Sequence, residues 1–154
     1  MFELKLYEEI DRDLYLKSQK ETFEKYVIEF FGNFNQKIME EHLEILKDGL
    51  FKIMVNNEIA GFVYFKEEQE KIIVDVFCLF SNYRNSGLGS CVMNSFIKKA
   101  NELNKPIVLD TFKTNPAKKF YERHGFKVID ENNSHFILKY TPVLEDLGNV
   151  NKRI

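Results

Sequence analysis

The stretch from Ile72 to Asn104 constrains the fold more than any other part of the sequence. An apolar run over residues 72–80 ends in a loop with two glycines, and residues 87–104 then repeat apolar side chains at helical spacing. A second short apolar run follows at residues 106–110. A strand, a helix and a strand in this order predict two strands joined by a crossover helix, as in a βαβ unit.

Further strands and helices flank this unit on both sides. Residues 2–7 alternate as a half-buried strand, and the helical period that follows from Asp11 ends at Gly32. The other predicted elements are a helix from about Asn35 to Gly49 with Ile38, Leu43 and Leu46 inward, a hairpin of strands 50–55 and 59–65, a helix at 115–124, and strands at 126–129 and 135–140. The predicted order is β-α-α-β-β-β-α-β-α-β-β, an α/β fold with a mixed sheet. We expect one domain over residues 1–140 and a polar tail over residues 141–154.

Composition narrows the class of protein. The chain has 154 residues, 44% of them hydrophobic, and a formal net charge of -2, so a general binder of nucleic acid or anionic membranes is not expected. The N-terminus does not resemble a signal peptide, and no apolar run is long enough to span a bilayer. Cys78 and Cys91 form no disulfide framework and no metal-ligand spacing. We therefore expect a cytoplasmic protein without a metal.

The loop between the strand at 72–80 and the helix at 87–104 carries the chemistry. Free backbone amides at a helix start attract anions, and glycines let a phosphate approach the backbone closely. A tight turn is the other interpretation of the same glycines. No Lys-Ser or Lys-Thr follows Gly89, and a third glycine is missing, so neither a P-loop nor a dinucleotide fingerprint fits.

Two motifs resemble the GNAT acetyltransferase superfamily. The segment Leu79–Gly89 resembles its cofactor signature, with R-x-x-G-x-G at Arg84–Gly89, and Ala117–Phe126 resembles its A-x-x-x-Y-E-x-x-G-F element. One departure is that Thr114 stands where the family usually has asparagine, and Asn115 comes one residue late. The resemblance implies a GNAT fold whose central sheet is splayed at the cofactor site.

The resemblance also implies a site for acetyl-CoA. Backbone amides from Arg84 through Ser90 would hold the pyrophosphate, and the strand end at Phe77–Leu79 would separate from residues 106–110 and pair with the pantetheine. An amide near Leu79 would polarise the thioester carbonyl. The expected cofactor-binding residues are Phe77, Cys78, Leu79, Phe80, Arg84, Asn85, Ser86, Gly87, Leu88, Gly89, Ser90, Asn115, Ala117, Lys118, Phe120 and Tyr121.

The resemblance assigns Tyr121 as the general acid that protonates the leaving thiolate. Many relatives place a glutamate, as the general base, at the position that Val76 holds here. Asp75, Asp110 and His135 are the other candidates for the base. Strand alternation directs Asp75 to the opposite face from Val76 unless a bulge intervenes.

The predicted function is direct transfer of an acetyl group from acetyl-CoA to a primary amine in a ternary complex. Residues 14–46 and 134–140 would build the acceptor site, and His42 is expected to pack rather than react. The acceptor stays open among peptide N-termini, lysines, polyamines and drug-like amines. A CoA-binding module with little or no transferase activity is the alternative, and a longer acyl group is a third possibility. Dimers are common in the superfamily, so a homodimer is a further expectation.

Overall fold

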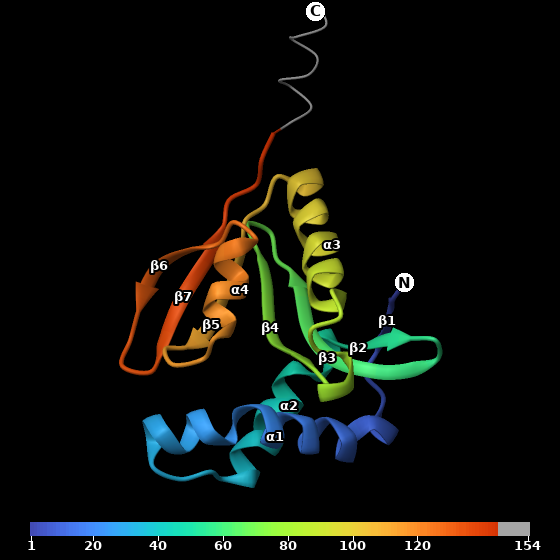
Figure 1. Cartoon of the computed structure of the whole chain (residues 1–154), viewed down its shortest axis with the longest axis vertical. Helices are drawn as coiled ribbons and strands as arrows, with labels where there is room; N and C mark the ends of the chain where they lie inside the picture. The colour runs from blue at the N-terminus through green and yellow to red at the C-terminus, as the bar shows by residue number, and fades with distance from the viewer. Residues whose placement is uncertain (145–154) are drawn as a thin grey trace, which may run out of the picture.

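The computed structural model describes residues 1–144 and contains one mixed sheet (Figure 1). Its seven strands lie in the order β1-β2-β3-β4-β5-β7-β6. Their bounds are β1 (Glu3–Leu6), β2 (Leu50–Val55), β3 (Glu58–Glu67), β4 (Ile72–Leu79), β5 (Ile107–Phe112), β6 (Lys127–Glu131) and β7 (His135–Tyr140). The pairing of β4 with β5 is parallel, and the other five pairings are antiparallel. The predicted mixed α/β fold is confirmed, while most of the expected tail over 141–154 lies outside the described residues.

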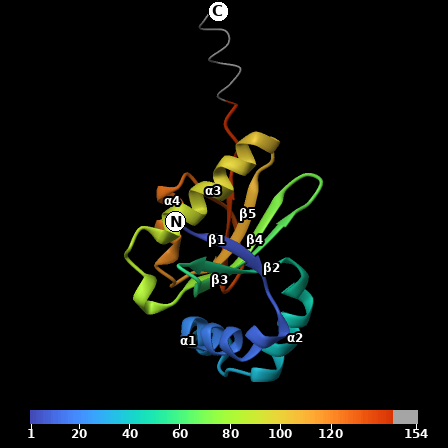
Figure 2. The same ribbon diagram turned by 90° about the vertical axis from the view of Figure 1, so that its right-hand side faces the viewer.

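Helices cover both faces of the sheet. They are α1 (Arg12–Phe31), α2 (Gln36–Leu46), α3 (Leu88–Leu103) and α4 (Ala117–Arg123). Figure 2 shows α1 and α2 on one side of the sheet and α3 on the other. The core is divided in the same way: Val92, Met93 and Phe96 of α3 pack with strand residues in one buried cluster. Tyr15 of α1 and Leu43 of α2 pack on Phe62 and Cys78 in the second cluster.

The two N-terminal helices end and begin where the sequence predicts. Gly32 closes α1 in a left-handed conformation with φ of 84°, and its N–H donates to Ile28. Asn35 caps α2 by accepting a hydrogen bond from the N–H of Lys37. The inward placement of Ile38 is wrong, because its side chain is 63% exposed and lines the mouth of the cavity described below.

The parallel pairing of β4 with β5 is short. It joins Ile72 to Ile107 and Ile73 to Val108 and extends no further, although both strands continue. In Figure 1 the two strands diverge toward α1. From Val74 onward, the edge of β4 that faces β5 therefore has no strand partner.

A β-bulge interrupts β4 on its other side, where it pairs with β3. Phe62 pairs with Cys78 and Tyr64 with Asp75, so one residue of β3 lies opposite both Val76 and Phe77. Val76 has a φ of 46°, a left-handed conformation that is rare for a β-branched residue, and its N–H donates to Oδ1 of Asp75 at 2.7 Å. The bulge resets the alternation of side chains along β4.

The bulge decides the direction of Asp75. Val76 and Cys78 pack in the cluster under α1 and α2, whereas Val74, Phe77 and Leu79 belong to the cluster under α3. Asp75 precedes the bulge and follows Val74, so it shares the α1 side with Val76. Strict alternation, which separates Asp75 from Val76, is wrong here because the extra residue places both on one face.

Gly61 of β3 allows the close approach of β3 and β4 beyond the bulge. It pairs with Leu79, and a Cβ at this position would collide with the backbone carbonyl of Cys78. We expect Gly61→Ala to lower the free energy of unfolding by about 1–3 kcal/mol, measured by urea denaturation, because the two strands must separate. The matched control is Gly89→Ala, whose Cβ would meet Phe120 at 3.6 Å, an ordinary contact. Equal stability of the two variants would contradict this account of the strand packing.

Candidate active site

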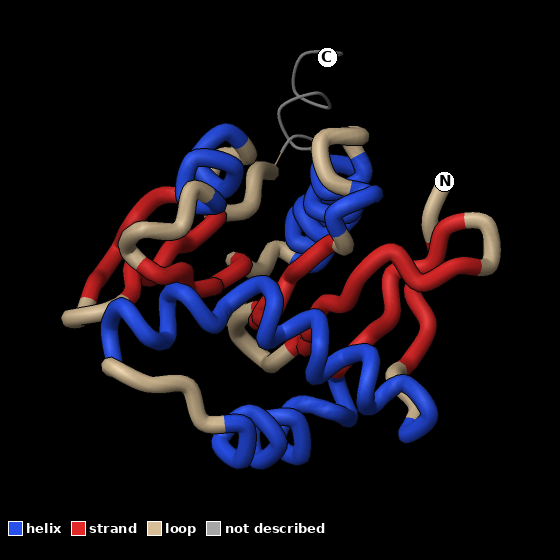
Figure 3. The backbone as a smooth tube through the Cα atoms, turned by 60° about the horizontal axis from the view of Figure 1, so that its bottom comes forward, coloured by secondary structure: helices blue, strands red, loops and turns tan. Residues whose placement is uncertain are grey.

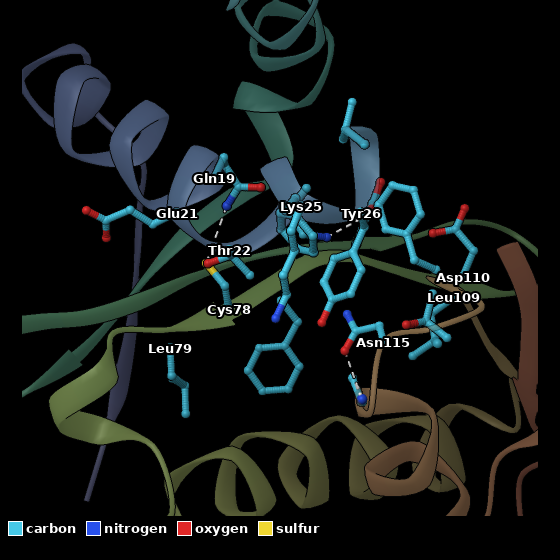
Figure 4. A pocket seen from close by; sticks show the side chains of 18 of the residues that line it. Gln19, Glu21, Thr22, Lys25, Tyr26, Cys78, Leu79, Leu109, Asp110 and Asn115 are labelled. Atoms are coloured by element: carbon cyan, nitrogen blue, oxygen red, sulfur yellow. Dashed lines mark hydrogen bonds between the residues drawn. The ribbon is translucent and has the colours of Figure 1, made fainter. Parts of the chain in front are cut away.

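A cavity of about 1160 Å³ opens where β4 and β5 separate (Figure 4). One part is lined by the end of β4, the loop before α3, and α4. The other part is lined by α1, α2, β5 and the start of β7. Figure 3 shows α1 crossing beneath the separated strands, with α3 and α4 on the far side. The separation of two strands thus connects both faces of the sheet through one cavity.

The loop before α3 is built to hold an anion. Asn85 and Gly87 both have positive φ, 58° and 84°, so successive backbone amides turn toward one side of the loop. Within the described residues, the N–H groups of Asn85, Ser86 and Gly87 donate to no protein acceptor. The amides of Gly89 and Ser90 lie in the first turn of α3, where the helix supplies no acceptor. Five amides and a helix dipole therefore favour a negatively charged group here.

Arg84 fixes this loop to the strand before it. Its Nε donates to the carbonyl oxygen of Leu79 at 2.9 Å, and Oγ of Ser86 donates to the carbonyl of Tyr83 at 2.6 Å. The anion site and the free edge of β4 are thus held in one rigid arrangement. Phe77 and Phe120 contact edge to face beside them, with ring centroids 6.3 Å apart.

Tyr121 of α4 lines the cavity from the side of α3. Its side chain is buried and forms no hydrogen bond with the described residues. Burial is the main cause that raises the pKa of the Tyr121 phenol, and the negative charges of Asp75 and Asp110 raise it further. Tyr121 is therefore protonated at neutral pH and has a proton to donate into the cavity.

Two carboxylates line the α1 side of the cavity. Asp75 comes from β4 and Asp110 from β5. Burial raises the pKa of the Asp75 carboxyl, and the charge of Asp110 raises it further. The N–H of Val76 and the charges of His42 and His135 lower this pKa by smaller amounts. Asp75 is thus a stronger base than an ordinary aspartate.

The two histidines on this side of the cavity have different surroundings. The ring of His135 lies 4.1 Å from that of Phe112, and its Nδ1 shares a hydrogen bond of 2.7 Å with Oγ of Ser134. His42 of α2 is exposed and lines the cavity, so the expectation that it only packs is wrong. The cause is that Leu43 and Leu46 face the core, and this turns His42 to the open side of α2.

Thr114 and Asn115 show what the departure from the family motif does. Oγ1 of Thr114 donates to Oε1 of Glu29 at 2.8 Å, which ties the end of α1 to the loop after β5. Oδ1 of Asn115 accepts a hydrogen bond from the N–H of Ala117, the first residue of α4, at 2.9 Å (Figure 4). The side-chain NH₂ of Asn115, which lines the cavity, still has donors for a ligand.

Most residues predicted from the sequence meet in this cavity. Those that line it are Asp75, Phe77, Cys78, Leu79, Arg84, Asn85, Gly87, Gly89, Ser90, Asp110, Asn115, Ala117, Phe120, Tyr121 and His135. The side chains of Phe80, Ser86, Leu88 and Lys118 do not line it. Nζ of Lys118 lies 5.0 Å from the ring centre of Phe136 and 3.7 Å from Glu122, so its predicted cofactor contact stays a prediction.

Gln19 is a residue that the sequence did not single out. Its Nε2 lies 3.3 Å from Sγ of Cys78, which holds the buried thiol beside the cavity (Figure 4). Helical spacing from Tyr15 would have placed Gln19 on the inner face of α1. A polar residue on that apolar face was the available signal.

Comparisons with known proteins agree with this geometry. A family model described as the acetyltransferase (GNAT) family matches residues 14–126. The PaiA N-acetyltransferase from Thermoplasma acidophilum, solved in complex with coenzyme A, superposes with a TM-score of 0.69 at 17% identity, covering 92% of this chain and 99% of that one. Ard1 from Thermoplasma volcanium superposes with a TM-score of 0.66 at 14% identity, covering 92% and 98%. The ribosomal-protein-S18-alanine N-acetyltransferase from Escherichia coli superposes with a TM-score of 0.63 at 16% identity, covering 92% of this chain and 94% of that one.

No curated protein sequence matches this chain significantly. Across residues 1–144, no helix has both the length and the apolarity needed to cross a membrane. The same residues contain no group of three or more side chains that could together hold a metal ion.

Gly87 has a φ of 84°, and we expect the anion site to depend on this left-handed conformation. We expect Gly87→Val to lower the affinity for CoA about tenfold or more, measured by calorimetry, because a β-branched residue cannot hold this φ without strain. The matched control is Asn85→Gly, which keeps the other left-handed position free of strain and should retain the affinity. Unchanged CoA binding by Gly87→Val would show that the amides of this loop are not the phosphate site.

Proposed function

This chain belongs to the acetyltransferase (GNAT) family, and we propose that it transfers an acetyl group from acetyl-CoA to a primary amine. The amine would belong to a small molecule or a peptide, and the transfer would be direct, within a ternary complex. One observation carries this proposal: a single cavity joins an anion-binding loop, a free strand edge, a protonated tyrosine and a basic carboxylate.

The cofactor would lie across the first part of the cavity. The loop amides from Asn85 to Ser90 suit a pyrophosphate, and the free edge of β4 beyond Val74 offers backbone groups to the amides of a pantetheine arm. The NH₂ of Asn115 is a further donor beside that arm. An N–H at the end of β4, near Leu79, would stabilise the negative charge that develops on the thioester oxygen.

Asp75 is our candidate for the general base. An amine enters mostly as an ammonium ion, which has no lone pair, so one proton must leave before attack. The Asp75 carboxylate would take that proton directly or through a water molecule. The neutral nitrogen then forms the N–C bond to the acetyl carbon.

Tyr121 is our candidate for the general acid. When the C–S bond breaks, the CoA sulfur leaves with the electron pair, and the Tyr121 phenol would supply its proton. The second proton that the nitrogen loses would restore the phenol. The overall reaction then yields an N-acetyl amide, CoA as the free thiol and one released proton.

A CoA-binding module without transferase activity is the alternative. It draws on Val76, which stands where many relatives carry a glutamate. The bulge weakens this reading, because it places the carboxylate of Asp75 on the same side as Val76. A screen for thiol release from acetyl-CoA with a panel of amines separates the two functions. Tight CoA binding without release for any amine would favour the binding module.

Removal of the Tyr121 hydroxyl tests the general acid. We expect Tyr121→Phe to lower kcat about 10²-fold while the affinity for acetyl-CoA stays unchanged, because the ring and its packing remain. The matched control is Tyr140→Phe, which removes another buried phenol whose hydroxyl donates to Asn101 outside the cavity. Stopped-flow thiol release and acetyl-CoA titration give the two values. Full turnover of Tyr121→Phe would exclude Tyr121 as the acid.

The charge of Asp110 tests the assignment of Asp75 as base. The base acts as a carboxylate, so kcat/KM falls as pH drops through the pKa of Asp75. The Asp110 charge raises this pKa. Asp110→Asn should therefore move the acidic limb of the pH profile to lower pH, and Asp75→Asn should abolish that limb.

The other groups near Asp75 are the same in both variants, so they serve as a common background. They are Tyr15 of α1, His42 of α2, Tyr121 of α4 and His135 of β7. If Asp75→Asn retains the limb of the original protein, one of the two histidines is the base instead.

A further inference from the structure

The cavity side away from the cofactor loop carries two acids, Asp75 and Asp110, and among the described residues no lysine or arginine pairs with either of them. Among the described residues, neither Asp75 nor Asp110 forms a salt bridge. Both lie on strands, and the carboxyl of Asp110 is open to the cavity. Two unpaired carboxylates on one surface favour a cation in front of them.

The lysine and arginine side chains that line the cavity lie elsewhere or are already engaged. His42 and His135 also line this part of the cavity, but among the described residues neither forms a salt bridge with Asp75 or Asp110. Arg84 donates to Leu79 in the loop before α3, and Arg123 is on α4. Lys25 of α1 has its Nζ 4.9 Å from the ring centre of Tyr26, which is a cation–π distance. Its ammonium is therefore directed at a ring rather than at either acid.

Aromatic rings line the same part of the cavity as this pair of acids. Phe112 of β5 contacts Phe23, Tyr26 and Phe30 of α1, with ring centroids 6.5, 5.5 and 5.9 Å apart. The ring of His135 lies against the same phenylalanine. Phe23, Tyr26, Phe112 and His135 all contribute to the cavity lining, so a flat group could lie against rings here.

The apolar lining continues to the mouth of the cavity. Phe31 at the end of α1 is 62% exposed and Ile38 in the first turn of α2 is 63% exposed, and both line the cavity, as does Phe34. Large apolar side chains at a cavity mouth are typical of a site for an apolar ligand.

We propose that the acceptor is a primary amine that carries an aromatic ring and no anionic group, bound with its ammonium between Asp75 and Asp110. The ring would lie among the aromatic side chains of α1 and β5. This proposal rests on the proposed acetyl transfer and specifies its substrate class. A carboxylate next to the amine, as in a free amino acid, would face the two aspartates and be repelled.

The test compares amines that differ by one feature. Phenethylamine has the ring and the amine, butylamine lacks the ring, phenylalanine adds a carboxylate, and phenylalaninamide adds an uncharged group of similar size. We expect kcat/KM for phenethylamine to exceed that for butylamine about tenfold, from burial of the ring. After correction for the more basic amine of phenylalanine, we expect its kcat/KM to fall about 10²-fold below that of phenylalaninamide, because the carboxylate is repelled.

The role of Asp110 has its own variant. Asp110→Asn should lower the affinity of the CoA-bound protein for phenethylamine about tenfold in calorimetry, while the affinity for CoA itself stays the same. Asp48→Asn removes an exposed carboxylate outside the cavity and serves as the control. Loss of amine affinity in both variants, or in neither, would contradict the placement of the ammonium.

The outcomes separate this inference from the proposed function. Faster thiol release with phenylalanine than with phenylalaninamide would overturn the inference, and Lys25 would then be the binder of the carboxylate, while acetyl transfer would stand. Preference for butylamine or for spermidine over phenethylamine would overturn the aromatic part. Binding of phenethylamine without thiol release from any amine would support the site and contradict the transferase.

Discussion

The two-residue parallel contact between β4 and β5 is the constraint on which the rest of the site depends. Beyond Ile73 and Val108 each strand follows its own antiparallel partner, so β4 continues with β3 and β5 with β7. A full ladder would have consumed the backbone groups of β4 and closed the passage between the faces of the sheet. The incomplete ladder instead gives the cavity both a polar strand edge and access from two sides. The helices on the two faces can therefore contribute to one site: α3 and α4 from one side, α1 and α2 from the other.

The bulge in β4 turns this opening into a chemical site. Holding Val76 at a positive φ costs on the order of 1–3 kcal/mol, and such strain persists only where surrounding structure fixes it. Here the side chain of Asp75 accepts a hydrogen bond from the N–H of Val76. Gly61, which has no Cβ, allows β3 to pack closely against β4 next to the bulge. The same hydrogen bond fixes the carboxylate that we assign as base. Backbone strain and the position of the base are thus consequences of one local arrangement.

The regular elements could be predicted from the sequence because each depends on a local pattern. The period of α3, the glycine that ends α1 and the asparagines that turn β2 into β3 are all visible within a few residues. The cavity residues that belong to the two sequence motifs, such as Tyr121 and the loop from Arg84, were predictable for the same reason. What could not be predicted depends on contacts distant in the chain: the bulge at Val76 requires its register with β3, and the turning of His42 toward the cavity requires the packing of α2. Thr114 donates a hydrogen bond to Glu29, 85 positions away, and no local sequence pattern predicts that pair.

The negative charges in the cavity raise the pKa of both the proposed acid, Tyr121, and the proposed base, Asp75. Asp110 raises the pKa of Asp75, and Asp75 and Asp110 both raise the pKa of Tyr121. Acetyl transfer to an ammonium ion needs two proton transfers. A carboxylate must be basic enough to take a proton from the ammonium, and a phenol must keep its own proton until the CoA sulfur leaves. Both needs are met by burial together with the negative charges in the cavity, and the same charges attract the ammonium ion. Once the first proton has left the amine and Asp75 is neutral, that part of the field falls, which lowers the pKa of Tyr121 and eases its proton toward the departing thiolate. The order of the two proton transfers is therefore favoured by the electrostatic coupling of the two groups.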